Sequence, residues 1–568
     1  MLTTLAAPAF AKEWYIEDGD ITVKAGETKG TNKVSQGANQ EVEDTDTIIK
    51  NREDTASSNT VTIDAGSDKV EVTLKDVNID TSSRNKAAVS VTGSGNTTIK
   101  LDGDNHLTGG NGIYSNSSGS LTISGDENDS LTAQGGDSRN GIYSVSGDVT
   151  ISGGTVTATG GNSTGSYGSG GDGIHSGSLT ISGGTVTATG GGSTGSNGLG
   201  GRGICSDSCG VTISGGSTVN AKGGSGNISG GDGICSDSGD VTISGGTVTA
   251  TGGGSTGSNG FGGRGICSDN GGVTISGGTV TANGGNGDYS GGNGISSSDR
   301  VAISGSTVTA NGGNGGNVSG DGIRSGGGVT ISGNTVNAAG GNGGKVGGYG
   351  ICSFDRVAIS GGTVEAAGGS SGSSNGGSGI YSSDIDLSGS LELTAKAGSP
   401  NGKALSQKGS ELDLNAIKDK LGPGAKVTAT DADGKVIAQV PIPRPVEPEG
   451  PVIPEESSSS SGGGSAAPSA PASPLPGLTV TDKDGQRISY TSTQSGNTLT
   501  VCVGRFTASL RASLSALRPL RAEGIETITF QTILCSTTLS VDELLAMGGE
   551  DAEAVLTHRF TDSSLTVG

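Results

Sequence analysis

Residues 149–158 read Val-Thr-Ile-Ser-Gly-Gly-Thr-Val-Thr-Ala, and close variants of this stretch recur along half of the chain. Each variant follows a Gly-Ile pair and is followed by a glycine-rich tail. A fixed period of about thirty residues is typical of repeat proteins in which every repeat contacts only its neighbours. The isoleucines of the ten Gly-Ile pairs are Ile113, Ile142, Ile174, Ile204, Ile234, Ile266, Ile295, Ile323, Ile351 and Ile380.

Alternation within one repeat predicts two short strands. Val149 and Ile151 would share one face, as would Val156 and Ala158, while the threonines and the serine between them point outward. The Gly-Gly pair between the two strands is expected at a corner, because glycine adopts backbone angles that are closed to residues with a Cβ. The repeat therefore predicts one coil of a parallel β-solenoid.

A single coil cannot fold alone. It buries roughly five apolar side chains, each worth at most about 1.5–3 kcal/mol, whereas ordering each of its residues costs about 1–2 kcal/mol. Only pairing with coils above and below closes this gap, so we expect a continuous stack with the strand spacing of about 4.7–4.9 Å.

The composition excludes several classes of protein. With 112 glycines in 568 residues and 3% aromatics, the chain cannot build the thick core of an ordinary enzyme of its length. Its net charge of −22 makes nucleic acid an unfavourable partner, because an acidic surface repels phosphates. We expect no membrane span, since the sequence has no apolar run of about 20 residues. We also expect a monomer.

The chain divides into six predicted segments. Residues 1–11 end in Ala-Phe-Ala and resemble the remnant of a secretory signal peptide, which predicts a secreted or cell-surface protein. The others are N-terminal lead-in strands and cap (12–107), the solenoid repeats (108–395), a terminal cap (396–440), a Pro/Ser/Gly linker (441–477) and a small α+β domain (478–568).

The lead-in and the C-terminal domain have their own patterns. Strands are expected at 61–63, 70–74, 77–79, 89–91 and 98–101, and in the last domain at 499–501, 527–530 and 555–560. Leu510, Leu514 and Leu517 predict a helix ended by Pro519, and the capping box at 540–543 predicts the start of a second helix.

Stacking converts each repeat position into a column, and one column suggests a binding track. The residue after each Gly-Ile isoleucine should face outward, and it is often aromatic or charged. We predict ligand-binding residues there, although a tolerant surface ladder is the alternative interpretation. The predicted ligand-binding residues are Tyr114, Tyr143, His175, Arg324 and Tyr381.

Two further columns carry charge. Two residues before the isoleucine, the chain alternates Asp172, Arg202, Asp232 and Arg264, which we interpret as a structural ladder of opposite charges. Three residues after it, acids recur without cations in their own column. Because calcium takes six to eight oxygen ligands, we predict a calcium site there, with solvated turn aspartates as the alternative. The predicted metal ligands are Asp207, Asp237 and Asp269.

Cysteines give no clear framework. Cys205, Cys235 and Cys267 share a column on consecutive coils, and Cys205 could instead pair with Cys209. Free thiols are expected if the producing organism is anaerobic. We expect no zinc site, because the ligands lack the paired sequence spacing of structural zinc sites. The sequence does not decide whether Cys502 and Cys535 form a disulfide.

Catalytic motifs are scarce. The three histidines are far apart in sequence, and no nucleophile elbow joins a strand to a helix. No pair of carboxylates is marked as an acid and a base. We therefore expect a protein that is not an enzyme. Arg324 remains the one candidate for a catalytic base.

The lead-in Val72-Thr-Leu-Lys-Asp-Val-Asn-Ile79, the segment Lys100-Leu-Asp-Gly-Asp-Asn-His-Leu107 and the repeats together resemble secreted carbohydrate-binding right-handed parallel β-helix proteins of Gram-positive bacteria. The resemblance covers roughly residues 60–395. It implies a pectate-lyase-like fold and calcium-assisted binding of an acidic polysaccharide such as pectin. The longer glycine tails and the interrupting arginines depart from that pattern.

The sequence thus predicts an all-β protein, a right-handed parallel β-helix with a small C-terminal α+β domain. Two functions from different classes remain open. One is a glycan-binding surface protein; the other is a structural or adhesive stalk. A polysaccharide lyase is a more distant alternative.

Overall fold

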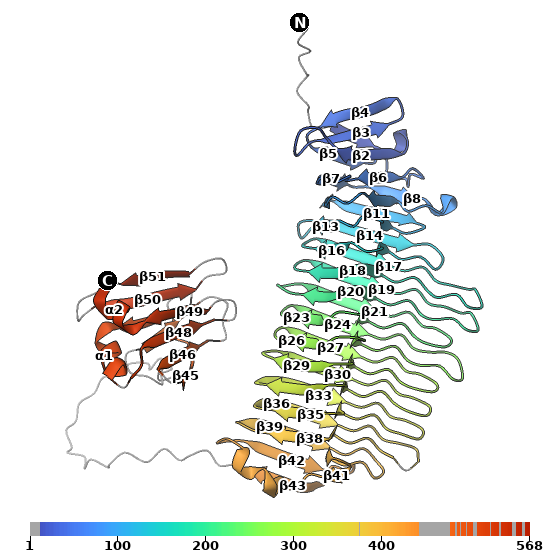
Figure 1. Cartoon of the computed structure of the whole chain (residues 1–568). Coiled ribbons are helices and arrows are strands. Elements are labelled where there is room, and N and C mark those ends of the chain that lie inside the picture. Colours follow the sequence, from blue (N-terminus) through green and yellow to red (C-terminus); the bar gives the residue numbers. More distant parts are fainter. Residues whose placement is uncertain are drawn as a thin grey trace, which may run out of the picture. The chain divides into compact units, whose positions relative to one another are not determined.

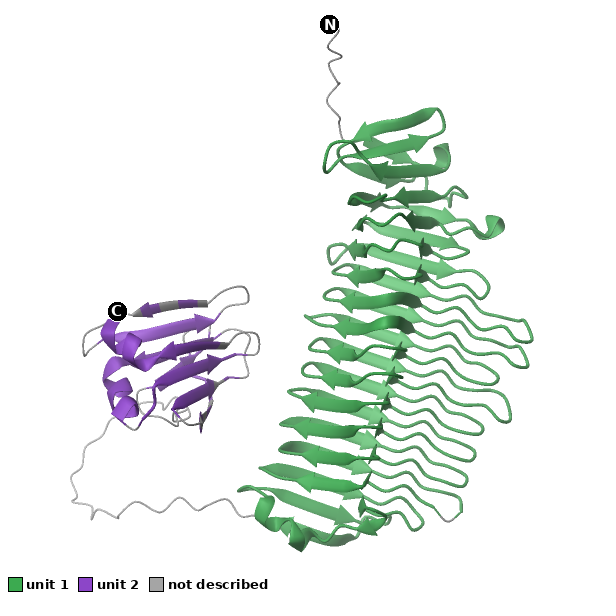
Figure 2. Cartoon of the chain, in the orientation of Figure 1, with its two compact units in different colours: residues 1–447 green, residues 448–568 purple. Residues whose placement is uncertain are grey.

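A computed structural model describes residues 12–441 except 374, and residues 478–568 with short gaps at 483–485, 489, 496, 504–507, 523, 533–535, 548–551, 559–562 and 568. The chain forms two compact units, residues 1–447 and 448–568 (Figure 2). The predicted signal peptide remnant lies outside the described residues, as does nearly all of the predicted linker. No helix in the described part of the chain is long and apolar enough to cross a membrane.

The first unit is a right-handed parallel β-helix of about 15 turns (Figure 1). Each turn carries three short strands, which stack into three ladders. The first ladder contains the Gly-Ile isoleucines: β6 (Val61–Asp64), β9 (Val89–Thr92), β12 (Ile113–Ser115), β15 (Ile142–Ser144), β18 (Ile174–Ile181), β20 (Ile204–Ile213), β22 (Ile234–Ser236), β25 (Ile266–Ser268), β28 (Ile295–Ser297), β31 (Ile323–Ser325), β34 (Ile351–Ser353), β37 (Ile380–Ser382) and β40 (Leu405–Gln407).

The second ladder contains the Val-Thr-Ile segments, and β18 and β20 run through both ladders without a break. Its further strands are β7 (Val70–Lys75), β10 (Thr97–Asp102), β13 (Leu121–Ser124), β16 (Asp148–Ile151), β23 (Val241–Ile243), β26 (Val273–Ile275), β29 (Arg300–Ser304), β32 (Gly328–Ser332), β35 (Arg356–Ile359) and β38 (Asp384–Leu387).

The third ladder contains the Thr-Val-Thr-Ala segments and forms a separate 14-stranded sheet. Its strands are β8 (Asn78–Asp80), β11 (Asp104–Gly109), β14 (Ser130–Gly135), β17 (Thr155–Thr159), β19 (Thr185–Thr189), β21 (Thr218–Lys222), β24 (Thr247–Thr251), β27 (Thr279–Asn283), β30 (Thr307–Asn311), β33 (Asn334–Ala339), β36 (Gly362–Ala367), β39 (Leu391–Lys396), β42 (Lys426–Thr430) and β43 (Val436–Pro441).

The core of each coil follows the predicted alternation. In one coil Ile174, Leu179, Ile181, Val186 and Ala188 are each at most 1% exposed. The corner glycines also behave as expected, because Gly154 adopts a φ of +74° and Gly184 a φ of +76°. Identical residues stack from coil to coil, with Ile174 opposite Ile204. The lead-in strands predicted from 61 to 101 are all present.

The glycine tails have a role that the sequence did not reveal. They project from one side of the solenoid (Figure 1), and their outgoing and returning arms are joined by backbone hydrogen bonds. Gly191 donates to the carbonyl of Gly171, and Gly201 donates to that of Gly191, each at 2.8 Å. A Cβ at Gly191 would lie 2.0 Å from the carbonyl oxygen of Gly161. The tails are therefore a packed backbone layer, which we call the glycine fin (residues 160–171 and their equivalents in later coils).

Both ends of the solenoid are covered by antiparallel strands, which prevents other chains from pairing with the terminal coils. At the N-terminal end β1 (Lys12–Tyr15) and β5 (Thr47–Lys50) join the second ladder, while β2 (Ile21–Ala25), β3 (Asn32–Gln36) and β4 (Asn39–Asp44) form an antiparallel sheet. At the C-terminal end β42 and β43 are antiparallel, and β41 (Ser410–Glu411) turns back on β40. The short 3₁₀ helices are η1 (Ile16–Asp18), η2 (Ser82–Arg84), η3 (Leu414–Ala416) and η4 (Lys418–Lys420).

The second unit is a small α+β domain with its own core. Its two four-stranded sheets are β44 (Leu478–Thr481), β47 (Ala508–Ser513), β50 (Glu553–His558) and β51 (Ser563–Val567), and β45 (Thr491–Ser495), β46 (Thr498–Cys502), β48 (Thr527–Gln531) and β49 (Ser536–Ser540). The helices are α1 (Leu514–Ala522) and α2 (Val541–Met547).

One helix boundary in this domain was predicted wrongly. Leu510 lies in strand β47 and pairs with Leu556, and α1 begins only at Leu514. Pro519 lies inside that helix and does not end it. The predicted start of the second helix is confirmed, since α2 begins at Val541 and the backbone N–H of Glu543 donates to Ser540 Oγ at 3.4 Å. Of the two cysteines considered for a bridge, Cys535 lies outside the described residues.

Candidate functional site

The predicted binding track is a continuous column on the first ladder. Tyr114 pairs with Tyr143, Tyr143 with His175, and His175 with Cys205, each on neighbouring coils. The register continues without a break to Tyr381. Next to this column runs the position two residues before each isoleucine, which is charged at Asp172, Arg202, Asp232, Arg264 and Asp321, and the returning arm of the glycine fin follows it. Hollows open at the N-terminal end and in the middle of this surface, and we call the surface formed by the three features the track groove.

The N-terminal end of the track groove is an aromatic pocket of about 520 Å³. The rings of Tyr114 and Tyr143 lie 5.8 Å apart between centroids, and His175 contacts Tyr143 edge-on at 5.1 Å. The structure therefore brings three of the five predicted ligand residues together. The other lining residues are Thr60, Thr62, Asn85, Lys86, Ala87, Ser90, Gly110, Asn111 and Arg139.

Two basic residues in this pocket were not predicted from the sequence. Lys86 follows helix η2, and Arg139 lies in the short connection between β14 and β15. Both side chains are exposed, neither forms an ion pair within the described residues, and no acid lines the pocket. They belong to neither repeat column, so no periodic signal could have identified them.

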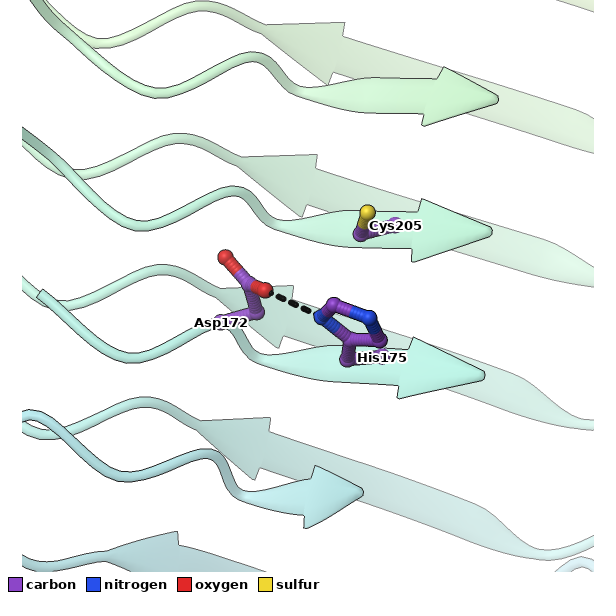
Figure 3. A group of neighbouring side chains, drawn as sticks. All are labelled: Asp172, His175 and Cys205. Atoms are coloured by element: carbon purple, nitrogen blue, oxygen red, sulfur yellow. Dashed lines mark hydrogen bonds and ion pairs between the residues drawn. The ribbon is translucent and has the colours of Figure 1, made fainter. Parts of the chain in front are cut away.

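The next part of the groove is a cluster around His175, shown in Figure 3. Its Nδ1 lies 2.7 Å from Asp172 Oδ2, and its Nε2 lies 2.9 Å from Asp207 Oδ2. Burial alone would lower the pKa of His175, but the two carboxylates outweigh it and raise the pKa to about 9. Donor atoms of Asp172, His175 and Cys205 lie within 4.8 Å of one another.

The middle of the groove is a ladder of alternating charges around a hollow of about 420 Å³. Asp232, 8% exposed, lies between two arginines, 3.7 Å from Arg202 Nε and 3.1 Å from Arg264 Nη2. Burial alone would lower the pKa of Arg264, but Asp232 and Asp269 raise it above its ordinary value. The structure confirms the ladder of opposite charges for Arg202, Asp232 and Arg264, whereas the Asp172 carboxylate pairs with His175.

The predicted calcium ligands do have basic partners, which come from neighbouring columns. Asp237 Oδ1 accepts a hydrogen bond from Arg202 Nη1 at 2.8 Å, and Asp269 Oδ2 accepts one from Arg264 Nη2 at 3.1 Å. Asp207 contacts His175, as described above. The sequence pattern showed no cation in their own column and could not show these pairs, because a long arginine side chain spans a rung. Calcium binding by these aspartates stays a prediction.

The cysteines of the column are not exposed, contrary to the expectation that every residue of the column faces the solvent. Cys205, Cys235, Cys267 and Cys352 are each at most 1% exposed. They lie beneath the charged side chains, with Arg202 Nη1 only 2.8 Å from Cys205 Sγ. Burial raises the pKa of the Cys205 thiol to about 12 although Arg202 opposes it. Cys235 and Cys267 form a disulfide, while Cys205, Cys209 and Cys352 are free.

The C-terminal end of the groove is a second aromatic group. Tyr349 and Tyr381 stack with centroids 4.8 Å apart. Arg324 donates from Nη1 to Asp321 Oδ2 at 2.8 Å, and its guanidinium lies 4.9 Å from the Phe354 ring centroid. The predicted residues Arg324 and Tyr381 thus lie several coils away from Tyr114 and Tyr143, at the other end of the same track.

An apolar edge runs along the tip of the glycine fin. Parallel bridges connect Leu199, Ser229, Phe261, Ser290 and Val318 on successive coils. Several large apolar side chains here are exposed by more than a third, and Phe261 lies 5.5 Å from Tyr289 between ring centroids. The exposed residues are Tyr167, Leu199, Ile228, Phe261, Tyr289 and Val318.

Comparison with known families agrees with this fold. The family described as Beta helix repeat matches residues 179–201, 241–263 and 273–299. No curated protein and no solved structure matches the chain. The chain is a parallel β-helix protein, and the matched residues lie in the coils that build the middle of the track groove.

Proposed function

We propose that this protein is a secreted or cell-surface protein that binds an acidic polysaccharide along the track groove. One observation carries the proposal: the pocket at Tyr114 and Tyr143 combines two aromatic rings with Lys86 and Arg139, which form no ion pair within the described residues. Carbohydrate recognition uses apolar ring faces together with a few placed polar groups, and this pocket supplies both. Its position at one end of the unbroken column from Tyr114 to Tyr381 suits a linear polymer.

The charge of the pocket favours an acidic sugar. The protein as a whole carries a net charge of −22, so an anionic polymer is repelled by most of its surface. At the pocket, Lys86 and Arg139 can pair directly with carboxylates of the polymer. A direct ion pair removes the need for a bridging cation at this point.

Calcium-assisted binding at Asp207, Asp237 and Asp269 is the second route to the same function. These acids contact His175, Arg202 and Arg264 of the track, and a cation there could bridge them to carboxylates of the polymer. Their existing partners His175, Arg202 and Arg264 compete for the same oxygens. A chelator distinguishes the two routes, because only the calcium route depends on the ion.

The test is the affinity of the purified chain for polygalacturonate, with a neutral glucan of similar length as the comparison polymer. The double variant Lys86→Ala/Arg139→Ala should bind polygalacturonate about tenfold more weakly, since each exposed charge pair contributes up to about 1 kcal/mol. Binding should also weaken with added salt. Tyr114→Ala should reduce affinity for the same polymer.

The matched control is Arg300→Ala/Lys396→Ala, which removes the same charge from strands β29 and β39, outside the track groove. This control should bind like the wild type. Equal weakening in both double variants would show that only the overall charge matters. No binding of polygalacturonate by the wild type would overturn the proposal and favour a structural stalk, which the long hydrogen-bonded stack also supports.

We further propose that binding occurs without catalysis. A base for β-elimination must take a proton next to a carboxylate. Arg324, the remaining candidate, is held by Asp321 and lies against Phe354. Burial alone would lower its pKa, but Asp321 raises the pKa above its ordinary value. A guanidinium in this environment keeps its proton, which supports a binding role.

A further inference from the structure

The cluster around His175 brings together three kinds of donor atom. Asp172 and His175 lie on one coil, and Cys205 lies at the equivalent position on the next (Figure 3). They offer a carboxylate oxygen, an imidazole nitrogen and a sulfur. This is the donor set of a borderline-soft transition metal, whereas calcium takes oxygen alone. We propose that Asp172, His175 and Cys205 bind one zinc ion.

Each of the three ligand residues also contacts a second residue that orients it. The Nε2 of His175 contacts Asp207, which leaves Nδ1 facing Asp172. The backbone N–H of Arg202 donates to Asp172 Oδ1 at 2.6 Å, so that Oδ2 is directed at the imidazole. Arg202 Nη1 donates to Cys205 Sγ at 2.8 Å. Metal sites in proteins are built in this way, with outer partners that orient the ligands.

The distances need only a small adjustment. Donors of a tetrahedral zinc ion lie about 3.3–3.6 Å apart at ordinary bond lengths. In the cluster the Asp172 and His175 donors are 2.7 Å apart, and all three donors lie within 4.8 Å of one another. Side-chain rotations that move each donor atom by less than a bond length would bring all three donors to a common ion. The fourth position would be left to water or to an oxygen of a bound ligand.

Binding would release two protons to solvent: the thiol proton of Cys205, replaced by a zinc–sulfur bond, and the Nδ1 proton of His175 that faces Asp172, replaced by a zinc–nitrogen bond. The surroundings accommodate the added charge, because the carboxylates of Asp172 and Asp207 and the thiolate together offset the divalent ion and the neighbouring Arg202 guanidinium. The proposal is independent of polysaccharide binding, since it concerns the metal alone.

The chain contains a matched internal control. Asp321, Arg324 and Cys352 occupy the same three positions on two later coils, and Cys352 is equally buried. There, however, an arginine that cannot ligate a metal replaces the histidine. Cys352→Ser therefore removes an equivalent buried thiol without removing a donor of the proposed site.

The experiment titrates the non-reduced full-length chain, stripped of metal, with Zn²⁺ against a chromophoric chelator. Non-reducing conditions keep the Cys235–Cys267 disulfide closed, which excludes those sulfurs as ligands. Co²⁺ then serves as the spectroscopic probe, because thiolate coordination gives a charge-transfer band in the near ultraviolet. We expect one Zn²⁺ per chain with a micromolar or lower Kd, and a thiolate–cobalt band.

Cys205→Ser and His175→Gln should each weaken zinc binding at least tenfold, and Cys205→Ser should abolish the cobalt band. Cys352→Ser should bind like the wild type, and Asp207→Asn should weaken binding by about 10–100-fold as an outer partner. Far-UV circular dichroism confirms that each variant keeps its strands. Absence of stoichiometric zinc binding by the wild type, or a cobalt band that survives in Cys205→Ser, would overturn the proposal.

Discussion

Arg202 and Asp237 lie on neighbouring coils and are joined by a hydrogen bond of 2.8 Å from Nη1 to Oδ1. The pair links two columns that the repeat pattern keeps separate. The same guanidinium also contacts Asp232 and the sulfur of Cys205. The track groove is therefore a network across columns, and removal of one member changes the environment of several others.

The calcium route predicts that polymer binding depends on the three aspartates Asp207, Asp237 and Asp269. Replacing Asp207, Asp237 and Asp269 together with Asn should weaken any calcium-dependent binding of polygalacturonate, because three carboxylates are lost. The measurement is polymer affinity with calcium and then with chelator, in wild type and triple variant. If wild-type binding is insensitive to the chelator, the calcium route is wrong and the direct contacts of Lys86 and Arg139 carry the function.

Asp232 is predicted to be a stabilising centre of the charge ladder. Asp232→Ala would leave Arg202 and Arg264, both largely buried, without a shared counter-charge. We expect a loss of about 2–3 kcal/mol, below the range for fully buried pairs because the arginines retain Asp237 and Asp269. Denaturant unfolding followed by circular dichroism measures it. Glu41→Ala, which removes the exposed partner of Lys24, should cost less than about 1 kcal/mol.

The glycine fin predicts a position-dependent cost of adding a methyl group. Gly191→Ala places a Cβ 2.0 Å from the carbonyl oxygen of Gly161, so neighbouring coils must separate. We expect a destabilisation of about 1–3 kcal/mol, seen as a lower thermal midpoint. Gly216→Ala is the control, because a Cβ there meets nothing within 4 Å. Equal stability of the two variants would show that the glycine fin accommodates the added methyl group without loss of stability.

The N-terminal cap should show acid sensitivity through Asp20. This carboxylate accepts hydrogen bonds from Arg84 Nη1 and Nη2 and from the backbone N–H of Thr60, which lower its pKa from 3.8 to about 2. A lowered pKa contributes stability that is present above pH 3.8 and is lost as the pH falls through about 2. Because the side chain is 46% exposed, we expect only about 1 kcal/mol.

Trp14 reports on this cap, because it is the single tryptophan and is 1% exposed. Its fluorescence during urea unfolding should show Asp20→Asn to be less stable than the wild type at pH 7, with the difference gone by about pH 2. A difference that persists unchanged at pH 2 would contradict the assignment to Asp20.

A lyase assay checks the expectation that the protein is not an enzyme. Purified chain incubated with polygalacturonate and calcium should release no unsaturated product absorbing in the ultraviolet, because the groove holds Arg324 as a paired cation. Steady product release that disappears in Arg324→Ala would make the protein a lyase.

Much of the fold could be predicted from the sequence, because a β-solenoid is built from local alternation repeated at a fixed period. Val149, Ile151, Val156 and Ala158 were assigned to the interior, and all four are fully buried. The columns followed from the same period, and the stacking of Tyr114 on Tyr143 confirms their register. The prediction of a helix at Leu510 was wrong, because Leu510 lies in β47, which pairs with the sequence-distant strand β50.

Which residues lie one above another follows from the repeat, since parallel in-register pairing preserves its period. Which columns contact each other becomes visible only in the folded chain. A zinc site was not expected from the sequence, because the ligands that we propose lack close spacing along the chain, yet the stack places Cys205 beside His175. Arg202 likewise reaches Asp237, and Lys86 and Arg139 meet at one pocket. The physical reason is that contacts across a groove depend on side-chain reach and on how far each loop projects, and neither quantity is encoded in the period of the repeat.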